Sequence, residues 1–311
     1  MEFRNYFGLS EGRVFEPQRK ALREHWFSYL LVVPTVLFMA LLIWFQFLYG
    51  VWLSFHQMSI LYPDLKWVGL DNYELLLSWN AMQKSIEVSV IYSLTLTVVH
   101  VLIGLTAALV INRIRKFEGV FNGIYLLGYT VAPVVIGTLW VYLLQPRLGP
   151  IFTYLVNWGI LQDPIFWSTN PDTALIGVII VGGWTFWPFA FIVFHANLQT
   201  IPDQHYEAAK IYGANRIQTF RKVTLPQLKS AFLMVVAIRL IWNVSKIGQP
   251  LQMTNGGPGY STSVLGILLY NQARTQGRLG RGYAVGVIMF LMTLAFVLLF
   301  IREYKRSTTE E

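Results

Sequence analysis

Five polar and aromatic side chains recur along an apolar segment near residue 240, and their types suit the binding of a polar solute. They are Arg239, Trp242, Asn243, Lys246 and Gln249. On a helix the spacings i, i+3, i+4, i+7 and i+10 place them on one face. Asn, Lys and Arg side chains bind hydroxyl groups, and a Trp ring stacks on the face of a sugar.

The two cations of this face, Arg239 and Lys246, point to a solute pathway if the segment spans a membrane. A charge inside a membrane segment is costly unless protein or water surrounds it, which favours a functional role. The alternative is that both side chains bond to carbonyls of neighbouring helices or extend toward a membrane surface.

A second aromatic stripe lies upstream. It consists of Trp184, Trp187, Pro188, Phe191 and His195, at i, i+3, i+4, i+7 and i+11. A stripe of this kind serves helix packing as often as it lines a pathway. We expect His195 to be a hydrogen-bonded residue between helices rather than a proton carrier.

Motifs for chemistry of the chain's own are missing from the sequence. No Gly-Lys pair occurs, which excludes the phosphate-binding loop of ATPases, and neither H-E-x-x-H nor G-x-S-x-G is found. Cysteine is absent, and the five histidines lack metal-ligand spacing. We therefore expect no enzyme activity, metal or cofactor in this chain, and any ATP hydrolysis must occur in a partner.

The composition is that of an integral membrane protein. Of 311 residues, 55% are hydrophobic and only 13% are charged, whereas soluble domains usually have about 25% charged residues. The net charge of +8 does not indicate nucleic-acid binding, because the Lys and Arg residues flank apolar segments.

Six apolar segments are long enough to span a membrane, since a spanning helix needs about 20 residues. They cover roughly 27–54, 86–111, 119–145, 173–199, 229–250 and 282–302. The sequence therefore predicts an all-α protein with six transmembrane helices. Pro133 marks a kink in the third segment. Outer loops are expected over 147–172 and 251–281.

The distribution of Lys and Arg predicts the orientation. Sixteen lie on the side of the N-terminus and six on the opposite side, which places both termini in the cytoplasm. We expect a cytoplasmic tail over 1–26, a transmembrane domain over 27–302 and a second tail over 303–311. No cleavable signal peptide is predicted, because no small-residue cleavage site follows the first apolar run.

A polar, basic loop over 201–228 separates the fourth and fifth segments and falls on the cytoplasmic side. Residues 202–226 are PDQHYEAAKIYGANRIQTFRKVTLP. Pro202 suits the first turn of a helix, Gly213 suits its end, and Asn215 can cap a second short helix. The loop therefore predicts a helix–turn–helix at the membrane surface. The alternative is an ordinary basic loop, which would not need these residues at these separations.

The same loop resembles the EAA loop of permease subunits of binding-protein-dependent ABC importers. The matching residues are Glu207, Ala208, Ala209, Gly213 and Ala214, followed by Leu225-Pro226. Tyr212 and Val223 depart from the pattern, standing where Asp and Ile are common. The resemblance implies that this loop is a coupling helix that docks on a cytoplasmic ATPase subunit.

Two further stretches resemble sugar-type permeases. Residues 67–73 (WVGLDNY) match a stretch after the first helix, and residues 254–258 (TNGGP) match a turn of maltose-type and glycerol-phosphate-type permeases. The resemblance implies that Trp242 and Asn243 on the fifth helix contact the substrate, together with Trp184 and Phe189 on the fourth. Lys246 stands where many relatives have an acidic or amide residue.

What the resemblance implies for the assembly is an importer of a sugar in a bacterial or archaeal inner membrane. Its partners would be a second, different permease, two ATP-binding cassette subunits that hold ATP and Mg²⁺, and an extracytoplasmic solute-binding protein. The alternatives are an ATP-independent secondary transporter or channel, for which no inverted repeat is evident, and a membrane enzyme, for which no catalytic cluster exists. The sequence does not specify the sugar.

Overall fold

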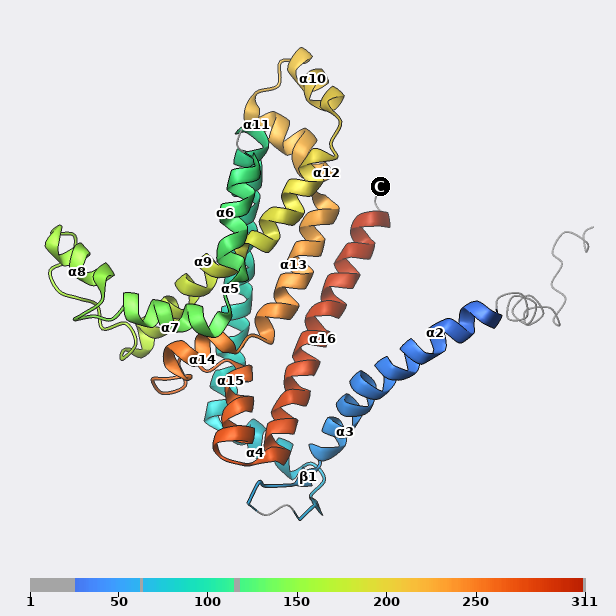
Figure 1. Ribbon diagram of the computed structural model, residues 1–311, viewed down its shortest axis with the longest axis vertical. Helices are drawn as coiled ribbons and strands as arrows, with labels where there is room; N and C mark the ends of the chain where they lie inside the picture. Colours follow the sequence, from blue (N-terminus) through green and yellow to red (C-terminus); the bar gives the residue numbers. More distant parts are fainter. Residues whose placement is uncertain (1–25, 62–63, 115–117, 310–311) are drawn as a thin grey trace, which may run out of the picture. The chain divides into compact units, whose positions relative to one another are not determined.

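A computed structural model of the chain describes residues 26–61, 64–114 and 118–309, which are mostly helical (Figure 1). The all-α prediction is confirmed apart from a two-stranded antiparallel ribbon, in which His56 pairs with Trp67 and Gln57 with Lys66. The chain divides into two compact units, residues 1–52 and 53–311. The predicted tail over 1–26 lies outside the described residues except for Trp26.

The first unit is built on one helix that begins at Trp26 and ends at Leu53, the first residue of the second unit. It comprises α2 (Trp26–Met39), the π-helical segment η1 (Ala40–Phe45) and α3 (Gln46–Leu53). Its side chains are almost uniformly apolar and exposed within this chain, as expected of a helix that faces lipid or a partner.

The second unit contains the remaining elements. They are β1 (His56–Gln57), β2 (Lys66–Trp67), α4 (Asp71–Ser78), α5 (Asn80–Ile114), α6 (Glu118–Thr130), α7 (Pro133–Leu143), α8 (Pro150–Asn157), α9 (Pro171–Gln199), α10 (Asp203–Ile211), α11 (Arg216–Thr219), η2 (Phe220–Thr224), α12 (Leu225–Gln227), α13 (Lys229–Val244), α14 (Gly248–Thr254), α15 (Leu265–Tyr270), η3 (Asn271–Thr275) and α16 (Leu279–Thr309).

Helices α5 and α9 form the centre of this unit, and α13 packs against both. Their close approach depends on glycine. A Cβ atom added to Gly104 would lie 2.6 Å from the Cβ of Ala190, and one added to Gly183 would lie 2.8 Å from Val99. Small residues of this kind let membrane helices approach each other closely.

The predicted kink at Pro133 is confirmed as a sharp bend. Helices α6 and α7 meet at 91°. Ala132, between them, has an extended ψ of 135°, because the residue before a proline disfavours the helical conformation. Pro133 then occupies the first turn of α7, where its missing N–H leaves no carbonyl without a partner.

The prediction of one continuous helix over 229–250 is wrong. Helix α13 ends at Val244, and α14 begins at Gly248. A helix running through this region would need the N–H of residue 250 to bond the carbonyl of Lys246, and Pro250 has none. Ser245 adds to the break, since its hydroxyl bonds the carbonyls of Ile241 and Trp242. Lys246 therefore lies in the break and not on α13.

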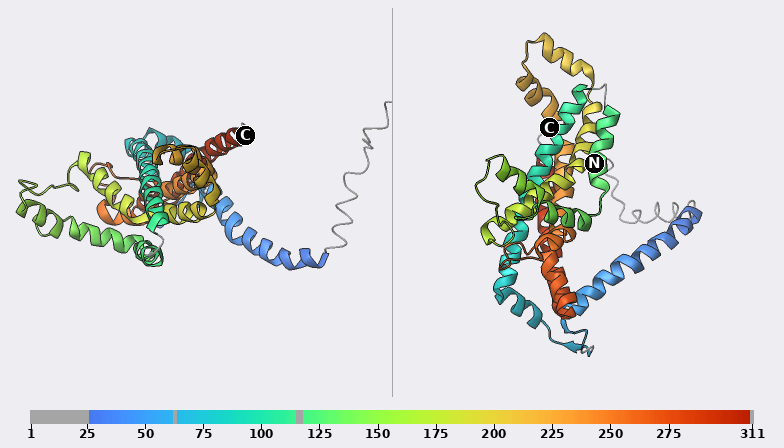
Figure 2. Two further views of the ribbon diagram at one scale, coloured as in Figure 1. Left: turned by 90° about the horizontal axis from the view of Figure 1, so that it is seen from above. Right: turned by 60° about the vertical axis from the view of Figure 1, so that its left-hand side comes forward.

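The predicted outer loop over 251–281 is more ordered than expected. Its tight turn is confirmed, with Asn255 and Gly256 at φ values of 48° and 85°. Beyond the turn, α15 and η3 form a helical return whose residues 265–268 are buried. This return packs with α4 and the start of α16 at one end of the unit, while α10 and α11 lie at the other (Figures 1 and 2).

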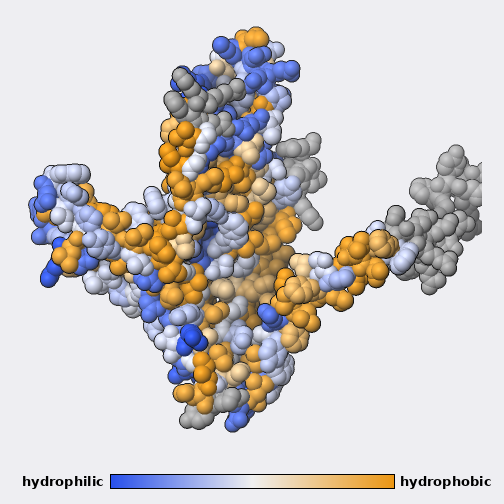
Figure 3. All heavy atoms as spheres, viewed as in Figure 1, coloured by the Kyte–Doolittle hydropathy of each residue, from blue (hydrophilic) through white to orange (hydrophobic). Residues whose placement is uncertain are grey.

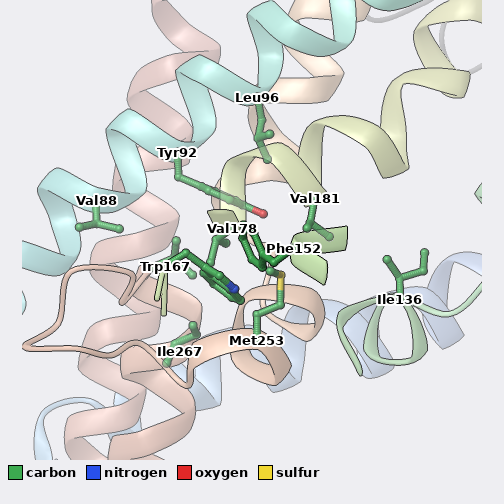
Figure 4. Close-up of a cluster of buried hydrophobic side chains, with 11 residues drawn as sticks. Val88, Tyr92, Leu96, Ile136, Phe152, Trp167, Val178, Val181, Met253 and Ile267 are labelled. Atoms are coloured by element: carbon green, nitrogen blue, oxygen red, sulfur yellow. The ribbon is translucent and has the colours of Figure 1, made fainter. Parts of the chain in front are cut away.

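The core of the second unit consists of three clusters of buried apolar residues. The first joins α5 and α9 to α14 and to Phe152 of α8 and Trp167, as Figure 4 shows. The second joins α5, α9 and α13 nearer the α10 end. The third joins α4, α5, α15 and α16 at the opposite end. The helices are thus fixed along their lengths.

Four helices of the described residues are long and apolar enough to cross a membrane. They are Trp26–Leu53, Asn80–Ile114, Pro171–Gln199 and Leu279–Arg302. Two bent pairs, α6 with α7 and residues 216–227 with α13, raise the number to six if each pair is one span.

Candidate functional site

Arg239 on α13 is the largest fully buried side chain described, with 1% exposure. Its Nη2 and Nε donate to Nδ1 of His100 on α5, at 2.8 and 3.2 Å. The Nε2 of the same ring lies 2.9 Å from the carbonyl oxygen of Gly182 on α9, to which it must donate. Because Nδ1 accepts while Nε2 donates, the His100 ring is neutral and its tautomer is assigned by these bonds.

The hydrogen-bonded chain continues from Arg239 to Asn243 and back to α5. Arg239 Nη2 donates to Oδ1 of Asn243 at 2.9 Å, and Nδ2 of Asn243 donates to the Thr97 hydroxyl at 3.1 Å. Thr97 in turn donates to the carbonyl of Ser93 at 2.7 Å. Arg239 and Asn243 therefore join α13 to α5 and α9, and both side chains are buried.

Gln249, the last residue of the predicted face, is also buried but makes separate contacts. It accepts a hydrogen bond from the hydroxyl of Tyr92 at 3.1 Å and donates to the carbonyl of Val178 at 3.1 Å. It therefore holds α14 against α5 and α9. Arg239, Asn243 and Gln249 of the predicted face thus belong to two buried networks.

Lys246 differs from Arg239 in its surroundings. Its Nζ lies 2.8 Å from the centroid of the Phe186 ring on α9. Arg239 also faces this ring, with Cζ at 5.7 Å from the centroid. Tyr129 of α6 approaches the ring edge-on at 6.3 Å. Phe186 thus connects the two cations, and sequence analysis did not single it out.

The predicted aromatic residues form two separate pairs. Trp242 meets Phe189 with ring centroids 4.8 Å apart, and Trp242 is 44% exposed. Trp184, which is 50% exposed, instead meets Trp140 of α7 at 5.4 Å. Positions 184 and 189 are five residues apart, so they point in different directions around α9. The Trp242–Phe189 pair and the Trp184–Trp140 pair therefore do not form one surface.

The remaining part of the second stripe is packing. Trp187 and Phe191 contact Tyr125 of α6, with ring centroids 4.8 and 5.0 Å apart. His195 stacks on Phe191 at 5.4 Å and lies beside Gln199. Both of these contacts lie within α9, so the interhelical role expected for His195 stays a prediction.

The loop between α9 and α13 forms the predicted helix–turn–helix. Gly213 ends α10 with φ +72°, a conformation that glycine adopts without strain. Its N–H donates to the carbonyl of Lys210 at 3.0 Å, and the N–H of Ala214 donates to the carbonyl of Ala209 at 2.9 Å. These two bonds define a Schellman turn, in which orphan carbonyls of the helix end are satisfied.

Asn215 begins α11 with a capping box, as its position in the sequence predicts. Its side chain accepts from the N–H of Gln218 at 2.9 Å, and the Gln218 side chain accepts from the N–H of Asn215 at 2.8 Å. The loop is therefore a defined surface in which Glu207, Ala208 and Gly213 are exposed while Ala209 and Ala214 are half-buried.

Three large apolar side chains are exposed at the tip of this loop. Ile211, Tyr212 and Ile217 are 84%, 88% and 67% exposed. Figure 3 shows hydrophilic atoms over this end with apolar atoms at the tip. Apolar groups rimmed by polar ones mark a protein interaction site. Sequence analysis missed them, although apolar residues in a basic loop were a signal.

No group of three or more His, Cys, Asp or Glu side chains in the described part of the chain is arranged to hold a metal ion.

A family model described as "binding-protein-dependent transport system inner membrane component" matches residues 100–305, more than half of the chain. The matched region includes the α10–α11 loop and, from the buried network, His100, Arg239 and Asn243.

Similar proteins include named permeases. The chain is 29% identical over 284 residues to the probable ABC transporter permease protein YurN of Bacillus subtilis, covering 91% of this chain and 97% of the relative. It is 29% identical over 283 residues to the trehalose/maltose transport system permease protein MalF of Thermococcus litoralis, covering 90% and 94%.

The fold is similar to that of a chain in a bacterial alginate ABC transporter, solved in complex with an alginate pentasaccharide-bound periplasmic protein. The TM-score is 0.77, the sequence identity is 22%, and the match covers 95% of this chain and 98% of the other. The likeness shows a common fold.

Proposed function

Because the chain belongs to the family of binding-protein-dependent transport system inner membrane components, we propose that it is the permease subunit of an ATP-driven ABC importer for a sugar. The observation that carries this proposal is the α10–α11 loop. Its Schellman turn and capping box present a rigid apolar tip at one end of a helical membrane protein.

The loop is suited to receive force from a partner. Two short helices joined by a hydrogen-bonded turn move as one body, whereas a flexible loop would absorb the motion. The exposed Ile211, Tyr212 and Ile217 fit an apolar groove on an ATPase subunit. Glu207 on the same surface is exposed and suits a basic residue at the rim of that groove. Ala208, Ala209, Gly213 and Ala214 keep the surface compact.

Six spans are the proposed membrane topology, with each bent pair counted as one. Both termini and the α10–α11 loop then lie in the cytoplasm, in agreement with the excess of Lys and Arg there. The end that carries α4, α15 and the 254–258 turn faces outward. The proposed location is accordingly a bacterial or archaeal cell (inner) membrane.

Partners supply what this chain lacks. Because this chain has no phosphate-binding loop, ATP and Mg²⁺ must bind to two ATP-binding cassette subunits. A second, different permease completes the pathway, and an extracytoplasmic solute-binding protein delivers the substrate. Closure of the ATPase dimer would be carried through Glu207 to Gly213 into the membrane helices.

The sugar assignment is supported by the trehalose/maltose relative and by the half-exposed pair of Trp242 and Phe189. Aromatic rings stack on the apolar face of a sugar ring. Lys246 lies one turn from Trp242 and has a polar head suited to hydroxyl groups. Arg239 and Asn243 hold the helix that presents them.

The test is purification of the tagged chain from its native membrane, followed by reconstitution in liposomes. If the chain is an importer permease, an ATPase copurifies with it. The reconstituted complex then supports ATP-dependent sugar uptake when its binding protein is present. A chain that purifies without an ATPase and transports solute down an ion gradient is a secondary transporter instead.

A further inference from the structure

The C-terminal part of the chain contains no acidic residue between Glu207 and Glu303. The same stretch holds eleven Lys and Arg residues, including Arg239 and Lys246. The other long helices add carboxylates only near their ends. Glu87 on α5 pairs with Lys84 at 3.0 Å, and Asp172 lies in the first turn of α9. The interior of the described membrane helices thus carries two cations and no counter-charge.

Arg239 donates through Nε and Nη2 to the hydrogen bonds that hold three helices together. Its partners His100 and Asn243 are both neutral, so these bonds engage its Nε and Nη2 donors without neutralising its charge. A buried charge without a counter-charge raises the electrostatic potential around it, because the interior screens it weakly. Any group that enters beside Phe186 meets this positive potential.

Lys246 has no hydrogen-bond acceptor among the described residues. It lies in the helix break, half-buried, with its Nζ against the Phe186 ring. An ammonium group carries three donors, and leaving them unmet in a membrane interior is costly. The half-exposed Trp242 lies one turn away on α13. Lys246 is therefore the cation that remains available to a bound solute.

A second positive site lies at the outward end of the proposed topology. A hollow of about 630 Å³ there is lined by residues that include Trp79, Gln276, Arg278 and Arg281. The two arginines stand at the start of α16, whose first turn has no acidic residue. Cations are disfavoured at this end of a helix, where the dipole is positive. Asp71 borders the adjacent hollow but makes no ion pair with either arginine in the described residues.

We propose that the imported sugar is anionic and that the Lys246 ammonium binds its carboxylate beside Phe186 and Trp242. This inference rests on the proposed function and adds the charge of the substrate. An ammonium–carboxylate contact would provide the missing counter-charge of the interior, and the Arg278–Arg281 hollow would attract the same solute at the outer end. A neutral sugar would leave both sites uncompensated.

The experiment compares free uronic acid oligosaccharides with their methyl esters, which keep the sugar rings and lose the charge. The probes are trigalacturonate, triglucuronate and trimannuronate, each with its fully methylated ester. Uptake is measured in liposomes that contain the complete importer with internal ATP and its binding protein. For at least one pair we expect the acid to be imported about tenfold faster or more, the size of a lost charge-assisted hydrogen bond.

Variants of Lys246 test its role in that preference. Lys246→Gln is expected to lower the ratio of acid to ester uptake about tenfold, because the acid loses a charge-assisted contact that the ester never makes, and Lys246→Arg to retain the acid preference. Lys84→Gln is the control, because it removes an exposed cation that pairs with Glu87.

Four results would overturn the inference: equal uptake of acid and ester, uptake of neutral sugars alone, uptake of none of the acids, or loss of the second permease from Lys246→Gln complexes. The last result would mean that the partner permease supplies the counter-charge. ATP-dependent uptake of a neutral sugar would refute the anionic substrate and leave the importer function intact. Purification without an ATPase would refute the importer itself.

Discussion

Arg239 on α13 and His100 on α5, 139 residues apart in the chain, are joined through Nη2 and Nδ1 at 2.8 Å. His100 can accept from Arg239 only because its other nitrogen donates to the carbonyl of Gly182. The contact therefore ties three helices together through one imidazole ring. Lys246, seven residues beyond Arg239, has no comparable bond to any residue that the structure describes. The two intramembrane cations thus have different roles, one in the fold and one at the surface of a helix break.

Replacement of the two cations should separate these roles. Arg239→Met removes the donors to His100 and Asn243 and leaves buried polar atoms without partners, which costs about 1–3 kcal/mol per group. We expect a clearly lower thermal midpoint in detergent, measured by fluorescence-detected size exclusion. Lys246→Met is the matched control and should keep the midpoint of the unmodified protein. Equal midpoints for both variants would mean that the Arg239 network does not stabilise the fold.

Changes in the α10–α11 loop should uncouple transport without preventing insertion. Gly213→Pro demands φ near −65° where the loop has +72°, and it removes the N–H that bonds Lys210. Glu207→Lys reverses an exposed charge. We expect both variants to lose most ATP-driven uptake while the chain still reaches the membrane.

Gly159 offers a matched control for the substitution of Gly213. It has φ +69° after α8, and the N–H groups of Gly159 and Ile160 make the same pair of turn bonds, to Val156 and Leu155. Gly159→Pro should therefore cost similar local stability and retain uptake. Normal uptake by the Glu207→Lys protein would rule out a coupling role for this surface.

The proposed topology is open to a direct test because the chain has no cysteine. Lys222→Cys, in the exposed part of η2, should react with a membrane-impermeant maleimide only after the membrane is opened. Asn255→Cys, exposed in the turn after α14, should react in intact cells. Labelling of position 222 from outside would reverse the orientation and remove the α10–α11 loop from the reach of an ATPase.

The parts of the structure that the sequence predicted depend on local rules. Gly213 and Asn215 end and begin helices through bonds to residues within five positions, so their types alone indicate the turn. Pro133 bends its helix for an equally local reason. The break at Lys246 also has a local cause, Pro250. It was not predicted, because the segment is apolar and long enough to be interpreted as one membrane-spanning helix.

The buried network could not be predicted, because it joins residues far apart in the chain. One signal was present in α5, where Ser85, Ser89, Ser93, Thr97 and His100 recur every three or four residues. That spacing indicates a polar face, and all five are buried. Within this face, Ser85 donates to the Ser263 hydroxyl and Ser89 accepts from the N–H of Leu265. Both partners lie in a segment that was expected to be an outer loop. Only the packing of α15 against α5 brings them together.

Two of the exposed tryptophans, Trp242 and Trp184, provide the final prediction, since only Trp242 belongs to the surface beside Lys246. Trp242 contacts Phe189, and the centroid of its ring lies 5.8 Å from Cζ of Arg239. Trp184 contacts Trp140 of α7 instead. Trp242→Ala removes the aromatic face available to a sugar ring, and loss of stacking on such a face costs up to about 1.5 kcal/mol, or roughly tenfold in affinity.

We therefore expect Trp242→Ala to raise the substrate concentration for half-maximal uptake about tenfold, and Trp184→Ala to leave it unchanged. Both variants remove a half-exposed indole from one aromatic pair, so their effects on the fold should be comparable and are checked by the thermal midpoint. If Trp184→Ala alone impairs uptake, the substrate passes between α7 and α9, and the surface beside Lys246 is helix packing.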